Sequence, residues 1–70
     1  MEEKVLEPHQ QRVVDEASEL IDKIEKLNTF THGEVFKKLT AHEINLLEQQ
    51  LLLMKQYHWI LRQRIRLFYE

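Results

Sequence analysis

The sequence predicts an all-α fold: an antiparallel hairpin of two long helices, with a short helical turn at the connection. The chain has 70 residues but a single glycine and a single proline, too few for the many tight turns of an all-β fold. Two long segments carry apolar residues at helical spacing, and a polar break separates them. We expect residues 1–7 to form an N-terminal arm and residues 8–70 to form one domain.

The first helix is expected to begin at Pro8, because the first turn of a helix does not need the N–H that proline lacks. Its apolar residues share one face at steps of three, four and seven: Val13, Val14, Ala17, Leu20, Ile21, Ile24 and Leu27. The polar segment 28–33 ends this pattern, and residues 34–39 are expected to add one helical turn. Three apolar side chains of that turn would close the hairpin: Val35, Phe36 and Leu39.

The second helix is expected to follow a capping box formed by Thr40 and Glu43 and to run to about Tyr69. Its main stripe forms a heptad-like seam: Ile44, Leu47, Leu51, Met54, His58, Leu61, Ile65 and Phe68. A second stripe lies beside it: Leu46, Leu53, Tyr57, Ile60 and Leu67, with Leu52 and Trp59 widening it further. One partner helix cannot cover both stripes, so the sequence predicts assembly into a helical-bundle homo-oligomer or a complex with another protein.

Composition excludes several classes of function. The chain has no cysteine, which fits a reducing compartment. Its formal net charge of −2 disfavours binding to duplex nucleic acid, and no apolar run is long enough to cross a membrane. The four histidines lack metal-ligand spacing, and no phosphate loop or nucleophile–base pattern is present. We therefore expect no enzyme activity, no metal and no cofactor.

One end of the hairpin gathers basic and aromatic residues. With the turn near residues 31–39, two residues that face each other across the hairpin should have numbers that sum to about 72. The first turn of the first helix would therefore lie beside residues 60–64. Four arginines meet at this end, Arg12, Arg62, Arg64 and Arg66, with the aromatic residues Tyr57, Trp59, Phe68 and Tyr69 nearby. Arginine forks match phosphate geometry and aromatic faces stack on bases. This end therefore has the components of a site for an anionic nucleotide.

A purely structural interpretation of the arginines stands beside this one. Alternate residues of a helix point in different directions, so Arg62 and Arg66 share a face with Trp59, whereas Arg64 shares another with Tyr57. Basic residues at a helix C-terminus also complement the helix dipole. They could, in addition, pair with the acidic arm residues Glu2, Glu3 and Glu7.

The chain resembles a known family of small phage proteins. Two strings carry the resemblance: Pro8-His9-Gln10-Gln11-Arg12-Val13, and the later Met54, Tyr57, Leu61, Arg64 and Ile65. They are similar to the helical hairpin shared by the anti-CBASS cyclic-nucleotide sponge and the Thoeris anti-defence sponge. The resemblance implies a homo-oligomer, often a hexamer, that binds cyclic oligonucleotide or cyclic ADP-ribose messengers between protomers and does not cleave them.

The function expected from these observations is sequestration of a nucleotide immune second messenger in the cytoplasm of an infected bacterial host. The arginines would meet phosphates or ribose hydroxyls, His9 and Gln10 would add hydrogen bonds, and Trp59, Tyr57 or Tyr69 would stack on a base. A helical protein–protein interaction module and a small structural phage protein remain the alternatives.

Overall fold

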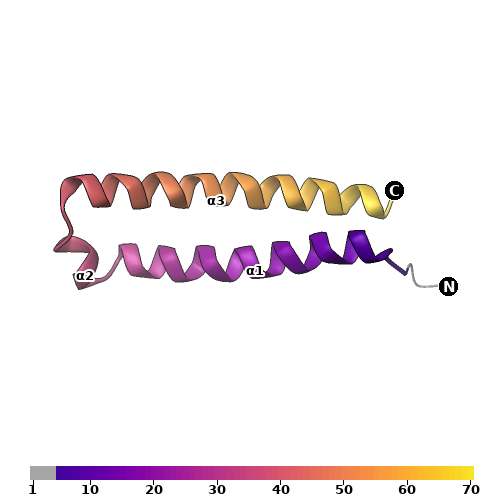
Figure 1. Cartoon of the computed structure of the whole chain (residues 1–70), viewed down its shortest axis with the longest axis horizontal. Helices are drawn as coiled ribbons and strands as arrows, with labels where there is room; N and C mark the ends of the chain where they lie inside the picture. The colour runs from indigo at the N-terminus through magenta and orange to yellow at the C-terminus, as the bar shows by residue number, and fades with distance from the viewer. Residues whose placement is uncertain (1–4) are drawn as a thin grey trace.

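The computed structural model describes residues 5–70 and contains helices α1 (Pro8–Thr31), α2 (Glu34–Lys37) and α3 (Ala41–Phe68). The long helices α1 and α3 run antiparallel and pack against each other, with the short α2 at the turn (Figure 1). No strand occurs in this part of the chain. The expected helical hairpin is confirmed, and the part of the expected arm formed by residues 1–4 lies outside the described residues.

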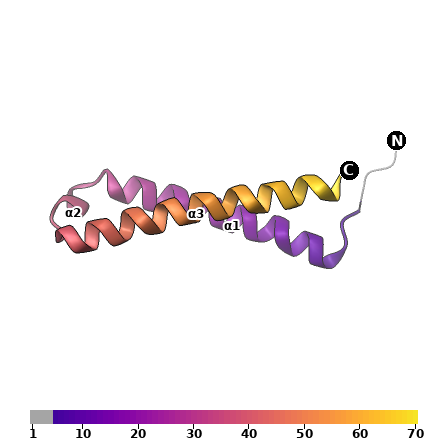
Figure 2. The same ribbon diagram turned by 90° about the horizontal axis from the view of Figure 1, so that it is seen from above.

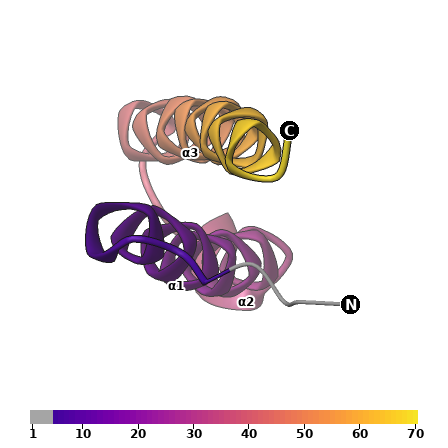
Figure 3. The same cartoon turned by 90° about the vertical axis from the view of Figure 1, so that its right-hand side faces the viewer.

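The hairpin is long and thin. Its principal extents are 54 × 17 × 16 Å, and its radius of gyration is 16.1 Å, compared with about 11 Å for a compact globule of this length. The two long helices cross near their middles when seen from above (Figure 2) and form two layers when seen end-on (Figure 3). Such a shape leaves most of each helix without cover from the chain itself.

Helix α1 begins as expected and ends later than expected. Pro8 takes the first helical position, and the Gln10 side chain accepts a hydrogen bond from the Glu7 backbone N–H at 2.9 Å. The helix continues to Thr31 instead of stopping at Asn28. The Thr31 hydroxyl donates to the Asn28 carbonyl at 2.7 Å, which satisfies an acceptor that a helix end leaves unpaired. The polar segment therefore extends the helix and caps it.

The helical turn at the connection is confirmed as α2, although one of its expected contacts is wrong. The rings of Phe30 and Phe36 pack edge to face with centroids 6.1 Å apart, and Leu39 is half-buried. Val35, by contrast, is 61% exposed. Adjacent helical residues point about 100° apart, so a single turn that buries Phe36 against Phe30 directs Val35 into solvent.

Helix α3 starts at the predicted cap, where the Thr40 hydroxyl accepts a hydrogen bond from the Glu43 N–H at 3.1 Å. All eight residues of its main stripe are buried or half-buried, which confirms the seam. Every member of the second stripe is exposed, together with Leu52 and Trp59. The described residues thus cover one face of α3 and leave another apolar face open.

The core lies toward the end of the hairpin where α1 begins and α3 ends. Val13, Ala17 and Leu61 form it, and Leu61 is fully buried. Three half-buried side chains pack around this cluster: Leu20, Ile65 and Phe68. Because this cluster packs the start of α1 against the last turns of α3, it also fixes the positions of the basic residues that border it.

Candidate functional site

The four arginines sit directly on the edges of the core. Arg12 precedes the buried Val13, Arg62 follows the buried Leu61, and Arg64 and Arg66 flank the half-buried Ile65. All four arginine side chains are exposed. We call this region, defined by Arg12, Arg62, Arg64 and Arg66, the arginine end. A rigid core therefore holds the arginine backbones while their guanidinium groups reach into solvent.

The side chains on α3 fall into two rows along different sides of the helix. At about 100° per residue, Tyr57 and Arg64 lie about 20° apart and form one row. Trp59 and Arg66 also lie about 20° apart, with Arg62 near them, and form the other row. Arg64 and Trp59 are about 140° apart. A single copy of the chain therefore does not bring the two rows into one pocket.

Tyr57 joins the two long helices through a contact that the sequence analysis missed. Its hydroxyl donates a hydrogen bond to the carboxylate of Glu16 on α1. This bond, aided by desolvation and the carboxylate charge, raises the pKa of Tyr57, while the positive charge of Arg64 acts in the opposite direction. Positions 16 and 57 sum to 73, so the register expected for the hairpin could have indicated this pair.

The residues expected from the first turn of α1 differ in their availability. His9 is exposed, whereas Gln10 is half-buried and its side-chain carbonyl is already an acceptor for the Glu7 N–H. Trp59 on α3 and Tyr69, which directly follows this helix, are each 59% exposed. The aromatic faces are therefore accessible, and Gln10 has its amide N–H₂ group left to offer a ligand.

Among the described residues, no carboxylate forms an ion pair with an arginine. Within residues 5–70, the one ion pair closer than 4.0 Å joins Lys37 to Glu34 at the opposite end of the hairpin. Arg66 donates to the side-chain carbonyl of Gln63 at 3.4 Å. Of the acidic arm, Glu2 and Glu3 lie outside the described residues, and Glu7 makes no such pair with an arginine. The guanidinium groups can therefore meet an external anion without first breaking a salt bridge to another of the described residues.

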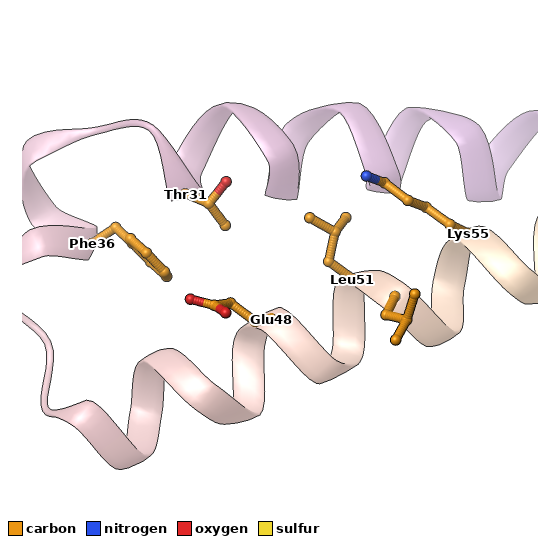
Figure 4. Close-up of a pocket in the computed structure, with 6 residues that line it drawn as sticks. Thr31, Phe36, Glu48, Leu51 and Lys55 are labelled. Carbon is orange, nitrogen blue, oxygen red and sulfur yellow. The ribbon is translucent and has the colours of Figure 1, made fainter.

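A hollow of about 320 Å³ lies at the closed end of the hairpin, away from the arginine end. Figure 4 shows Phe36 and Thr31 above Glu48, with the ammonium group of Lys55 directed toward α1. Leu51 and Leu52 complete its lining. One cation and one carboxylate give this hollow no net charge, so it favours an anionic ligand less than the arginine end does.

Two further hollows are open depressions. One, of about 380 Å³, lies on α1 between Asp22, Glu25, Lys26 and Thr29. The other, of about 490 Å³, lies on α3 and has a mainly apolar lining: Leu46, Gln49, Gln50, Leu53, Met54 and Tyr57. Of the residues expected to bind a ligand, these three hollows include Tyr57 alone.

The sequence match to a protein family covers nearly all of this architecture. A family model described as Sequestin matches residues 7–67, which include α1, α2, the four arginines and all but the last residue of α3. The chain belongs to the Sequestin family. No curated protein and no solved structure matches it. The family name denotes sequestration, which fits the sequestering type of protein indicated by the resemblance.

The described part of this Sequestin chain offers polar and cationic binding groups. Within it, no group of three or more His, Cys, Asp or Glu side chains could hold a metal ion. None of its helices combines the length and apolar character needed to span a membrane. Its arginines can pair with anionic groups, His9 and Gln10 can form hydrogen bonds, and Trp59 and the tyrosines can stack on a planar ring.

Proposed function

We propose that this Sequestin-family chain is a phage anti-defence sponge that binds a nucleotide immune second messenger and holds it intact. The observation that carries the proposal is the arginine end: four exposed guanidinium groups, fixed on a core and without carboxylate partners in the described chain, beside exposed aromatic faces. Phosphates pair with guanidinium groups, and bases stack on aromatic faces. Cyclic oligonucleotides and cyclic ADP-ribose isomers carry both phosphates and bases, and they are the proposed ligands.

The proposed sponge is a homo-oligomer. Its supporting observation is the division of α3 into two rows, with Tyr57 and Arg64 on one side and Trp59 on the other. A ligand that contacts residues of both rows requires a second copy of the chain to supply the second row. A hexamer is the assembly implied by the resemblance, and the cytoplasm of the infected bacterium is where a messenger of host immunity would be met.

The proposed action is stoichiometric and does not include cleavage. Cleavage would need a nucleophile, a general base and a group that stabilises developing negative charge, all placed around one bond. The residues at the arginine end supply charge stabilisation and stacking. A ligand incubated with the protein and then released by heat should therefore return unchanged, and steady formation of a new product would contradict this part of the proposal.

The test of the proposed function begins with the purified protein. A bound nucleotide raises the ratio of absorbance at nucleotide wavelengths to that at protein wavelengths, and mass spectrometry of a heat-released extract then identifies it. A binding screen against cyclic oligonucleotides and cyclic ADP-ribose isomers extends the test to ligand-free protein. If no member of this panel binds and none is co-purified, the nucleotide-sponge proposal fails.

The exposed apolar face of α3 supports a second candidate, a helical module that docks on another protein. Leu52, Leu53 and Trp59 are each more than half exposed, and contiguous apolar surface marks interaction sites. A host or phage protein recovered in stoichiometric complex with the chain, with no nucleotide, would favour this candidate over the sponge. A structural phage protein would instead be recovered with assembled phage particles.

A further inference from the structure

A second heptad repeat runs along the outer surface of α3. Four apolar residues recur every seven positions and are about half exposed: Leu46 (52%), Leu53 (62%), Ile60 (48%) and Leu67 (64%). Three glutamines recur at the same interval between them: Gln49, Gln56 and Gln63. In coiled-coil notation the apolar set takes position a and the glutamine set position d. We call these seven residues the outer repeat.

The outer repeat lies nearly opposite the seam with α1. In the same notation the seam residues take positions b and f, for example Leu61 at b and His58 at f. Positions a and d lie on the other side of the helix from b and f. The chain therefore uses one side of α3 for its own hairpin and leaves a second heptad face, about 32 Å long, without a partner in the described structure.

The face that carries the outer repeat has no acidic or basic side chain from Leu46 to Ile60, and arginines border it only beyond Leu61. Between Ile44 and Leu61, the acidic and basic side chains other than histidine are Glu48 and Lys55. Both border the hollow at the closed end of the hairpin and take position c, away from the outer repeat. A solvated helix face in a chain with 31% charged residues is expected to carry some of them. This face is typical of an interface.

The hollow of about 490 Å³ on α3 coincides with the outer repeat. Leu46, Gln49 and Leu53 line it, together with Tyr57 at position e. In paired helices, a side chain at position a or d inserts into a hole formed by four residues of the facing helix. This open depression therefore lies along the outer repeat, where a side chain of a facing helix could insert.

We propose that α3 pairs with α3 of a second copy of this chain, parallel and in register, through the outer repeat. The parallel arrangement places each leucine or isoleucine of the repeat against the same residue of the other copy, and each glutamine against the same glutamine. A glutamine amide carries both donors and acceptors, so two facing glutamines can satisfy each other. An antiparallel arrangement would place each glutamine opposite an apolar side chain, where its buried amide lacks a partner.

The pairing unites the two rows that a single copy separates. In a parallel pair, a residue at position g contacts position e of the next heptad on the facing helix, five residues further on. Trp59 at g therefore meets Arg64 of the second copy, in cation–π geometry, and Leu52 meets Tyr57. By two-fold symmetry the contact occurs twice, which places a basic and aromatic surface on each side of the pair. This inference rests on the assembly part of the proposed function.

Cysteine cross-linking tests the pairing and its direction. The natural chain has no cysteine, so Gln49→Cys and Gln63→Cys each introduce one reporter in the full-length protein. A disulfide requires Cα atoms within about 7 Å. In the parallel pair each variant faces its own copy, so each should form a covalent dimer on mild oxidation. Glu19→Cys, on the exposed side of α1, is the matched control and should remain uncross-linked.

The alternatives give different products. In an antiparallel pair that aligns the two repeats, position 49 lies opposite the apolar position 60 of the other copy, so mixing Gln49→Cys with Ile60→Cys would yield a 49–60 cross-link while Gln49→Cys alone does not dimerise; that result overturns the proposal. If the wild type is multimeric by light scattering but no disulfide forms, the α3 pairing is wrong while assembly stands. A monomeric wild type overturns both.

Trp59 provides a second readout, because it is the sole tryptophan of the chain. It is 59% exposed in one copy and should be partly covered by Arg64 of the second copy in the pair. Its fluorescence should therefore shift to longer wavelength when the wild type is diluted until it dissociates. An emission maximum that stays constant through dissociation would contradict the contact between Trp59 and Arg64.

Discussion

The hydroxyl of Tyr57 on α3 donates a hydrogen bond to the carboxylate of Glu16 on α1, close to the core of the hairpin. The two residues are 41 positions apart, so this bond reports directly on the register of the two helices. It also ties a predicted stacking residue to an acidic neighbour. Tyr57 therefore links the two helices of the hairpin and is also a candidate binding residue.

Replacing Glu16 should lower the pKa of Tyr57. The bond to the carboxylate favours the neutral phenol and raises this pKa above its ordinary value near 10.0. In a Tyr69→Phe background, which leaves Tyr57 as the sole tyrosine, absorbance of the phenolate against pH should show a titration that moves to lower pH on Glu16→Gln. Glu19→Gln is the matched control and should leave the curve in place.

The same contact sets a direction for stability against pH. Because the folded pKa of Tyr57 is raised, its stabilising contribution is complete below the unfolded value near 10 and is lost as pH rises through the folded value. Wild type should therefore lose stability in alkaline solution by a step that Tyr57→Phe lacks. Identical alkaline profiles for the two proteins would contradict the role of this bond.

Truncating Leu61 should be the most damaging change to the hairpin itself. Leu61 is 0% exposed and contacts the cluster with Val13 and Ala17. Leu61→Ala should cost about 2–5 kcal/mol, through lost burial and the cavity left behind, in a domain whose whole core supplies about 3–5 kcal/mol. Urea unfolding at matched concentration measures it. Val35→Ala, at a site 61% exposed, should cost much less; equal losses would contradict the assigned core.

A charge placed on the outer face of α3 should break the assembly and spare the hairpin. Leu53 is 62% exposed and Val35 is 61% exposed, so glutamate at either position remains in water within one copy. Burying that charge between copies costs several kcal/mol. By light scattering, Leu53→Glu and Ile60→Glu should dissociate or aggregate, while Val35→Glu should match the wild type. A well-folded wild-type monomer at micromolar concentration would contradict the expected assembly.

The sequence predicted the hairpin well because its signals are local and periodic. The seam of α3 and the apolar face of α1 follow from helical spacing, and the Thr40 cap follows from its own side-chain chemistry. The direction of Val35 was not predictable in this way, since a single turn has no periodicity to reveal its buried side. The late end of α1 was missed because the hydroxyl of Thr31 caps a segment that its composition marked as a break.

The candidate site was less accessible to sequence reasoning, because it depends on contacts between helices. The expected hairpin register predicted that the four arginines lie at one end of the molecule. The same register places Glu16 beside Tyr57, but the sequence analysis did not identify that contact. Gln10 was assigned to a ligand from its place in the first turn, whereas its carbonyl caps the helix by binding the Glu7 N–H. Only the three-dimensional structure shows that a side chain expected to bind a ligand is already used in a contact within the chain.

The last prediction concerns the arginine end and distinguishes a binding surface from a solvated helix end. If the arginines serve only the helix dipole, each is an exposed charge worth about 0–1 kcal/mol, and alanine in its place should change little. If one holds a phosphate, its removal costs a charge-assisted hydrogen bond of about 1.5–3 kcal/mol, a loss of about 10- to 150-fold in affinity. Arg12 and Arg64 should show the largest loss, because they lie within the strings that resemble the sponge family.

Isothermal titration of the Arg12→Ala, Arg62→Ala, Arg64→Ala and Arg66→Ala variants, with the nucleotide found by the binding screen, measures this loss. Lys37→Ala is the matched control, because it removes a cation at the closed end of the hairpin, where Lys37 pairs with Glu34. Melting temperature and oligomer size should stay near the wild-type values in the Arg12, Arg62, Arg66 and Lys37 variants, since these side chains are exposed. Arg64→Ala also removes the proposed contact with Trp59 of the second copy, so its affinity is measured at a concentration at which it is assembled. Wild-type affinity in all four arginine variants would place the ligand elsewhere and leave the arginines as a solvated helix end.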